Sequence, residues 1–155
     1  MTISSRFAVA THLLSLLELA PEGCVLSSEK MAQSAGVNPV IVRSVSGMLR
    51  RAGLVQSRQG VVGLHLARDA SAITLLDIYR AVQPPEQLFA LHARPSPDCA
   101  VGAHIQPLLQ AVCQEAQGAL EQRLAQTTLA DFCVQFEPSP QEGAGHVAEE
   151  HRHKS

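Results

Sequence analysis

The side chains best suited to chemistry in this chain are hydrogen-bond donors that lie between positions 28 and 59. Arginine donates to phosphate oxygens and to guanine, while serine, asparagine and glutamine can contact phosphates and base edges. These donors and the residues beside them are Ser28, Asn38, Pro39, Val40, Arg43, Ser44, Arg50, Arg51, Arg58 and Gln59. No phosphate-binding glycine loop, catalytic triad or paired carboxylates accompany them. We therefore expect a binding protein and not an enzyme.

Two short helices joined by a tight turn are predicted to position these donors. A serine at 27–28 can cap the first helix, and Gly36 suits the left-handed conformation that ends it. Asn38 is a good N-cap for the second helix, and Pro39 fits its first position. The second helix has one apolar face at helical spacing, formed by Val42, Val45, Met48 and Leu49.

A small hairpin is predicted to follow the second helix. Residues 54–57 and 61–67 have strand character, and residues 58–60 are a turn candidate. This order is the sequence form of a winged helix-turn-helix, which places its second helix in the major groove of DNA. The alternative is a helical core with a hairpin packed against it.

Within this device, the start of the second helix is expected to contact bases. Arg43 could recognise guanine, whereas the more favoured role of Asn38 is to cap the helix. Ser28 is a candidate phosphate contact at a helix N-terminus. Arg50 and Arg51 either touch phosphate or are solvated surface charges. At the hairpin tip, residues 58–59 can reach a phosphate or the minor groove.

The formal net charge of −2 looks wrong for a DNA-binding protein, but the charges are unevenly distributed along the chain. Residues 1–82 hold eight basic and five acidic side chains, and residues 83–155 hold four and nine. A mildly basic half beside an acidic half suits a module with one nucleic-acid face. The small surplus also supports an alternative function, a winged-helix protein-interaction module that has lost DNA binding.

Further helices are predicted on both sides of this device. Residues 3–20 form an amphipathic helix, residues 69–72 form a loop, and Thr74 caps a short helix that ends at Val82. A long helix spans about residues 101–126, and Thr128 caps a last short helix. We therefore predict a mainly α fold with a small β-hairpin. Its parts are a DNA-binding domain (1–82), a loop (83–100), a dimerisation helix with a short terminal helix (101–135) and a disordered tail (136–155).

The long helix carries an apolar stripe that is wide for a helix lying alone beside a small domain. The stripe includes Ile105, Leu108, Leu109, Val112, Ala116, Leu120 and Leu124. We interpret it as a dimerisation helix that packs partly on its own domain and partly on a partner. The alternative is a helix buried within one chain.

The four cysteines are Cys24, Cys99, Cys113 and Cys133, and no pair has the spacing of a redox or metal motif. No secretion signal or membrane span is recognised, so we expect reduced thiols, a cytoplasmic location and no membrane partner. Cys99 lies near the start of the long helix, where a helix N-terminus lowers the pKa of a thiol. It is the candidate redox sensor; the alternative is a spare exposed thiol.

Four segments resemble successive landmarks of one family of winged-helix transcription regulators, the Rrf2 family. They are NPVIVRSVSGMLRRAGLVQSRQG, ITLLDIYRAV, CAVG and TTLADF, and the resemblance spans residues 3–135. It implies a homodimer that binds a palindromic or near-palindromic double-stranded DNA operator and usually represses. Many members sense iron–sulfur status, nitric oxide, cysteine metabolism or redox stress.

Two features depart from the family pattern. The hairpin keeps Gly60 and Gly63, but Leu64 and His65 replace the usual glycine and aromatic residue. Cluster-binding members carry three closely spaced cysteines before the long helix, where this chain has only Cys99. The chain therefore resembles a cluster-free member, and we expect no iron–sulfur cluster, no other cofactor and no metal site.

Overall fold

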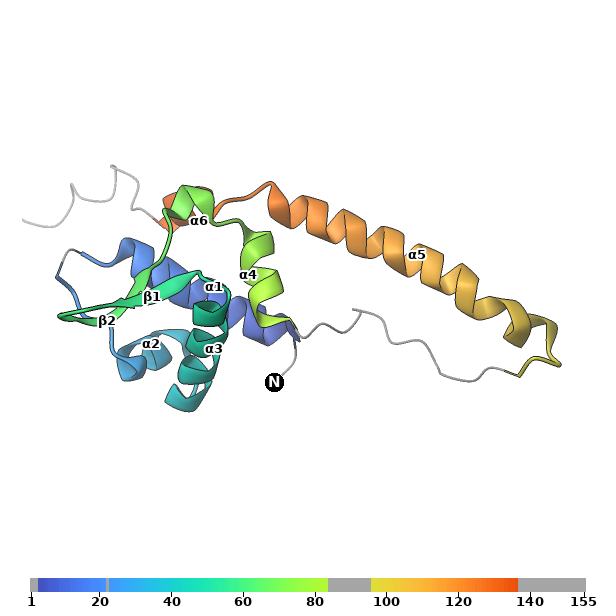
Figure 1. Ribbon diagram of the computed structural model, residues 1–155, viewed down its shortest axis with the longest axis horizontal. Coiled ribbons are helices and arrows are strands. Elements are labelled where there is room, and N and C mark those ends of the chain that lie inside the picture. The colour runs from blue at the N-terminus through green and yellow to red at the C-terminus, as the bar shows by residue number, and fades with distance from the viewer. Residues whose placement is uncertain (1–2, 22, 84–95, 137–155) are drawn as a thin grey trace, which may run out of the picture.

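A computed structural model describes residues 3–21, 23–83 and 96–136 of the chain, and its architecture is mainly helical with one β-hairpin (Figure 1). In chain order the elements are α1 (Ile3–Leu19), α2 (Ser28–Ala35), α3 (Pro39–Arg51), β1 (Val55–Arg58), β2 (Val61–Leu66), the 3₁₀-helix η1 (Ala70–Ala72), α4 (Leu75–Val82), α5 (Ala100–Ala125), α6 (Leu129–Cys133) and the 3₁₀-helix η2 (Val134–Phe136). The predicted fold class is confirmed. The predicted tail begins one residue too early, because Phe136 belongs to η2; the rest of it and most of the predicted loop before the long helix lie outside the described residues.

The core lies where α1 meets α2, α3, α4 and α6. Its buried apolar residues include Val9, Ala10, Leu13, Leu14, Met31, Val42, Val45, Leu49, Leu54, Ile73, Ile78, Val82 and Leu129. Each large aliphatic side chain contributes about 1.5–3 kcal/mol when it leaves water. This aliphatic packing orients α2 and α3 and supports the hairpin beside them.

The helix starts carry the caps that the sequence predicts. Ser27 caps α2, Asn38 caps α3, Thr74 caps α4 and Thr128 caps α6. The loop predicted at 69–72 is wrong. The Asp69 carboxylate accepts from the Ser71 N–H at 2.8 Å, and this local cap begins the 3₁₀ turn η1.

The hairpin differs from its prediction at one end. Strands β1 and β2 pair antiparallel, and the register becomes irregular between Gln56 and Arg58. Arg58 was predicted in the turn, but it ends β1 and pairs with Val61. Gly60 has φ of 77°, a left-handed conformation that favours glycine, so the reversal is one residue tighter.

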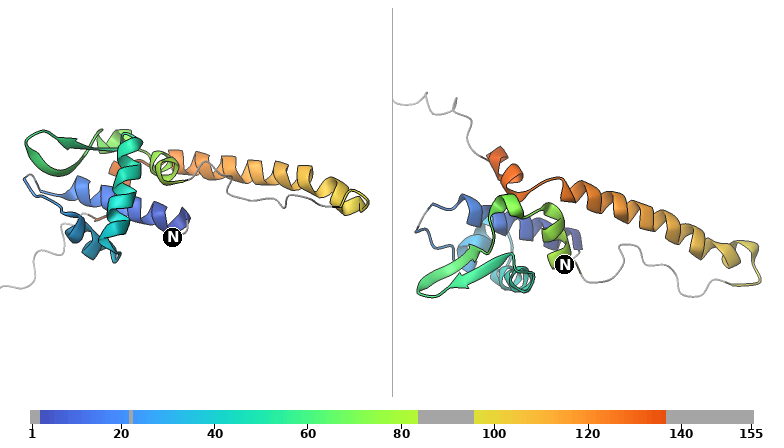
Figure 2. Two further views of the ribbon diagram at one scale, coloured as in Figure 1. Left: turned by 60° about the horizontal axis from the view of Figure 1, so that its bottom comes forward. Right: turned by 45° about the horizontal axis from the view of Figure 1, so that its top comes forward.

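Helix α5 extends away from the helical body as a long arm (Figures 1 and 2). It contacts α4, where Arg80 Nη2 donates to Glu121 Oε2 at 2.6 Å. No residue of α5 is buried among those that the structure describes. The alternative of a helix buried within one chain is therefore wrong, because most of the helix has no domain surface to lie on.

Candidate nucleic-acid interface

The turn between α2 and α3 is built by short-range hydrogen bonds. Gly36 ends α2 with φ of 64°, and the Val37 N–H donates to the Ala32 carbonyl at 3.0 Å. One residue later, Asn38 Oδ1 accepts from the Val40 N–H at 2.9 Å and begins α3. Only three residues separate the helices, so α3 leaves at a sharp angle and presents its N-terminal turn outward.

The N-terminal turns of α3 present an exposed surface. The side chain of Val40 is 63% exposed, and Arg43 and Ser44 lie beside it in solvent. Pro39 occupies the first helical position and is half-buried. The Asn38 carbonyl oxygen is used by the cap, as the sequence predicts. Asn38 therefore orients the helix, and Arg43 and Ser44 are the exposed side-chain donors near its start.

A groove of about 470 Å³ lies between α2, α3 and the hairpin. It brings together three of the predicted residues, Ser28, Arg43 and Arg50. Arg43 Nη2 lies 3.6 Å from Glu29 Oε1, and both side chains are largely exposed. Such an exposed pair contributes only about 0–1 kcal/mol, so an approaching phosphate can displace Glu29 at little cost.

Arg50 joins α3 to the hairpin. Its Nη2 donates to Ser57 Oγ at 3.2 Å, across the groove from α3 to β1. This bond places the guanidinium at the groove, while the packing of Leu49, Leu54 and Val55 in the core sets how α3 and the hairpin lie against each other. Arg51, the next residue, is exposed and lies outside the groove, with its guanidinium near Gly47.

The sequence analysis missed Ser46 as a groove residue. Ser46 is 8% exposed, lines the groove and makes no side-chain hydrogen bond to another described residue. A helical spacing of three and four residues places it between Arg43 and Arg50 on one face of α3. That spacing was the available signal in the sequence. Without knowledge of the groove, however, a serine within an apolar face indicates only ordinary packing.

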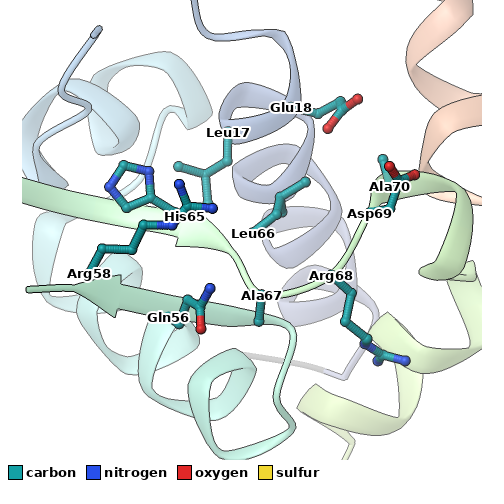
Figure 3. Close-up of a pocket in the computed structure, with 10 residues that line it drawn as sticks. All are labelled: Leu17, Glu18, Gln56, Arg58, His65, Leu66, Ala67, Arg68, Asp69 and Ala70. Atoms are coloured by element: carbon teal, nitrogen blue, oxygen red, sulfur yellow. The ribbon is translucent and has the colours of Figure 1, made fainter. Parts of the chain in front are cut away.

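The hairpin residues are divided between its two faces. Gln59 lies in the exposed turn, while Arg58 lines a second cavity on the other side of the hairpin from Ser57 (Figure 3). The groove therefore does not collect every predicted donor. Asn38, Pro39, Val40, Ser44, Arg51, Arg58 and Gln59 lie outside its lining.

One acidic side chain lies at the edge of the groove. The pKa of Glu29 is lowered by its own position at the open N–H groups of α2, by Ser27 and by Arg43. Glu29 therefore stays ionised near neutral pH and holds Arg43 in the free protein. A bound phosphate would compete with it for the same guanidinium.

The apolar stripe of α5 is exposed along most of its length. Leu108 is 69% exposed and Val112 is 62% exposed, and Leu109 and Ala116 are exposed as well. Ile105, Leu120 and Leu124 are half-buried. Large apolar side chains in a row on a projecting helix indicate a surface suited to contact with another molecule.

Cys99 is the N-cap residue of α5 and is exposed. The backbone N–H groups of Gly102 and Val101 lower the pKa of its thiol. By contrast, burial raises the pKa of Cys133 and favours its protonated form. Helix geometry thus gives Cys99 a stabilised thiolate that solvent can reach.

The cysteines of one chain do not come together as the cluster of thiolate ligands that most iron–sulfur centres use. Cys99 and Cys113 are fourteen residues apart, or about 20 Å along a helix. Cys24 lies before α2 and Cys133 is buried in α6. Within the described ranges, no group of three or more histidine, cysteine or acidic residues could hold a metal ion. No helix in those ranges has the length and apolar character to cross a membrane.

Comparison with known proteins agrees with this architecture. A protein-family model named Rrf2, described as an iron-dependent transcriptional regulator, matches residues 3–135. The chain is similar to YwnA of Bacillus subtilis (strain 168), described as an HTH-type transcriptional regulator. The two are 44% identical over 129 residues, which cover 83% of this chain and 95% of YwnA.

Solved structures show the same likeness. One described as a DNA-binding protein is 38% identical, has a TM-score of 0.67, and aligns over 82% of this chain and 97% of its own. The structure of CymR, the global cysteine regulator of B. subtilis, is 22% identical with a TM-score of 0.61. It aligns over 87% of this chain and 98% of CymR, a likeness of fold.

Proposed function

Because the chain belongs to the Rrf2 family of transcriptional regulators, we propose that it binds a palindromic DNA operator as a homodimer and acts as a repressor. In this proposal residues 1–82 contact DNA and residues 101–135 hold two copies together. The observation that carries it is the exposed start of α3 beside a groove that gathers Arg43 and Arg50.

Each donor has a role in this proposal. The N-terminal turn of α3 enters the major groove, where Val40 meets base methyl groups and Arg43 reads guanine. Ser44 lies one residue further along the same exposed surface. Ser28, Arg50 and Arg51 contact phosphates around this turn, and the hairpin residues Arg58 and Gln59 contact the neighbouring phosphate or minor groove.

Homodimerisation through α5 gives the operator its symmetry. Two copies related by a two-fold axis present two recognition helices, so they match two inverted half-sites about one helical turn of DNA apart. The exposed apolar residues of α5 supply the surface that each copy buries. The weak positive charge of the first half also makes two simultaneous contacts important for affinity.

Thiol oxidation is the proposed signal. Hydrogen peroxide transfers one oxygen to the Cys99 thiolate, which becomes a sulfenic acid as hydroxide leaves. A thiol of the partner subunit then attacks the sulfenic sulfur, forms a disulfide and releases water. Because Cys99 caps α5, this bond would reposition that helix and change the spacing of the two recognition helices.

The decisive experiment selects bound sequences from a random duplex library with the purified protein. The proposal requires an inverted repeat, and scrambling one half-site should weaken binding more than tenfold, roughly the cost of one lost half-site contact set. Placing the selected operator over a promoter should reduce transcription in vitro when the protein is added. No sequence enrichment would instead favour the alternative of an interaction module without DNA binding.

A further inference from the structure

A second cavity lies on the side of the hairpin that faces away from the groove (Figure 3). It measures about 400 Å³ and lies between the end of α1, the two strands and the segment 67–70. Leu17 and Leu66 form its apolar part. This volume falls within the range of pockets that bind small molecules, about 300–1,000 Å³.

The cavity gathers charged groups of both signs. Figure 3 shows Arg58 beside the His65 ring on the hairpin side, and the carboxylates of Glu18 and Asp69 on the other side. Arg68 also lines the cavity but extends away from these groups. A ligand with a negative group at one end and a positive group at the other would complement both sides of this lining.

Most polar side chains of this lining are exposed to solvent and are not held by other side chains of the described residues. The side chains of Glu18, Gln56 and Arg58 make no hydrogen bond or ion pair with any residue in the described ranges. His65 Nε2 is shielded from solvent and has no partner there either. Asp69 uses Oδ1 for Ser71 and leaves its second oxygen available. A polar ligand would replace water at the exposed Glu18, Gln56, Arg58 and Asp69, and the His65 ring is the one group of this lining with a shielded, unpartnered nitrogen.

We propose that this cavity binds a small zwitterion of the free amino acid class. The carboxylate of the ligand pairs with Arg58, while its ammonium group pairs with Glu18 and Asp69. Gln56 and His65 supply hydrogen bonds between the two ends. A dianion would meet the two carboxylates and a simple cation would leave Arg58 unpaired, so the mixed lining selects for both charges in one molecule.

Ligand binding would be coupled to DNA binding through Arg58, and this step rests on the proposed function. Arg58 can pair with a DNA phosphate or with the ligand carboxylate. Because both anions compete for the same guanidinium, binding of one weakens binding of the other. The zwitterion therefore acts as an effector that weakens operator binding. Because such coupling is reciprocal, operator DNA must weaken ligand binding by the same factor.

The test begins with the full-length protein and no DNA. Titration calorimetry and thermal shift are run with each of the twenty L-amino acids, β-alanine and γ-aminobutyrate, which vary the distance between the charges. Acetate and methylamine serve as single-charge fragments. At least one zwitterion should bind saturably and raise the melting temperature, and neither fragment should do so at the same concentration.

Variants then locate the site. Glu18→Gln and Arg58→Gln should each weaken binding of that zwitterion about tenfold or more, whereas Glu115→Gln, an exposed acid on α5, should leave it unchanged. The melting temperature of each free variant shows that it is folded. Absence of saturable binding for every zwitterion, or binding that survives both cavity variants, overturns the site.

A last measurement separates this proposal from the function on which its coupling rests. Operator affinity is measured with and without the bound zwitterion for the wild type and Glu18→Gln. The ligand should weaken operator binding by the wild type and not by Glu18→Gln. If the zwitterion binds saturably but does not change operator affinity, the coupling is overturned. If no operator is found, the proposed function fails, and the calorimetric titrations alone decide whether the cavity binds the zwitterion.

Discussion

Thr74 and Thr128 lie opposite each other in an isolated antiparallel bridge, and each begins a helix. Their flanks complete the contact: the Leu75 N–H donates to the Thr127 carbonyl at 2.9 Å, and the Leu129 N–H donates to the Ile73 carbonyl at 2.7 Å. Both threonines also form capping boxes. This bridge ties the segment after α5 to the start of α4, and together with the Arg80–Glu121 pair it holds the end of α5 on the helical body.

Removing one of these caps should destabilise the fold measurably. Thr128→Ala leaves the Asp131 N–H without its acceptor, Thr128 Oγ1 at 3.0 Å. We expect a loss of about 1 kcal/mol in the free energy of unfolding, measured by urea denaturation. Thr128→Ser keeps the hydroxyl and should retain most of the stability. Equal losses in both variants would show that the methyl group, and not the cap, matters.

The same cap predicts a dependence on pH. Hydrogen bonds from Thr128 lower the pKa of Asp131 below its ordinary value of 3.8. The contribution of the ionised Asp131 carboxylate to the stability of the fold is therefore complete above that value. It is lost as the pH falls through the lower folded-state pKa. Asp131→Asn should reduce the change in stability between pH 5 and pH 2 in thermal denaturation. An unchanged acid profile would contradict this assignment.

Loss of Arg43 or Arg58 should weaken operator binding without unfolding the protein. Arg43→Ala removes the proposed base contact and should cost about 1–3 kcal/mol, or roughly tenfold or more in affinity. Arg58→Ala should weaken operator binding. It should also make the affinity less dependent on salt concentration, by about the amount expected for the loss of one phosphate contact. Gel-shift titrations at several salt concentrations measure both. Arg123→Ala near the end of α5 is the control, and unchanged affinity in both test variants removes the assignment.

A charge placed on the exposed stripe of α5 should separate the two copies. Leu108→Asp and Val112→Asp each put a carboxylate into the proposed apolar interface, where burial of an unpaired charge is costly. Sedimentation velocity should show monomers for both variants at concentrations where the wild type is a dimer. Gln114→Asp, on the same helix at an exposed polar position, is the matched control. Dimers that persist in both stripe variants would place the interface elsewhere.

Cys99 should react as a thiolate at lower pH than an ordinary exposed thiol. In a variant that retains Cys99 as its single cysteine, the rate of iodoacetamide alkylation should reach half its maximum below pH 9.0, the ordinary thiol value. Glutathione serves as the reference. Peroxide should also change operator binding by the wild type and not by Cys99→Ser. An identical response of the two proteins would reject the thiol switch.

The hydroxyl group of Tyr79 offers a test of the core. It is buried and has no hydrogen-bond partner among the described residues. The Tyr79 ring packs edge-on against Phe7, with 5.9 Å between the two ring centroids. Tyr79→Phe should therefore leave stability unchanged or raise it by up to about 1 kcal/mol. Tyr79→Ala, which removes the ring, should cost about 3–5 kcal/mol. Clear destabilisation by Tyr79→Phe would reveal a partner for the hydroxyl.

The caps and helix spans were accessible from the sequence because they depend on residues at most four positions apart. Asn38 followed by Pro39 is sufficient to begin α3, and Thr128 with Asp131 is sufficient to begin α6. The same local signals indicated the helix-turn-helix and the family. The short 3₁₀ turn η1 was missed because a single Asp cap resembles any polar loop.

Contacts between distant segments were decided by the tertiary structure. The sequence determined that Arg50 lies in the last turn of α3 and that Ser57 lies in a strand, but only packing brings Arg50 Nη2 within 3.2 Å of Ser57 Oγ. In the same way, the sequence supplied Glu18, Arg58 and His65 separately, and the fold gathered them around one cavity. The physical reason is that local hydrogen bonds fix each element, while burial of a shared apolar core fixes the angles and register between elements.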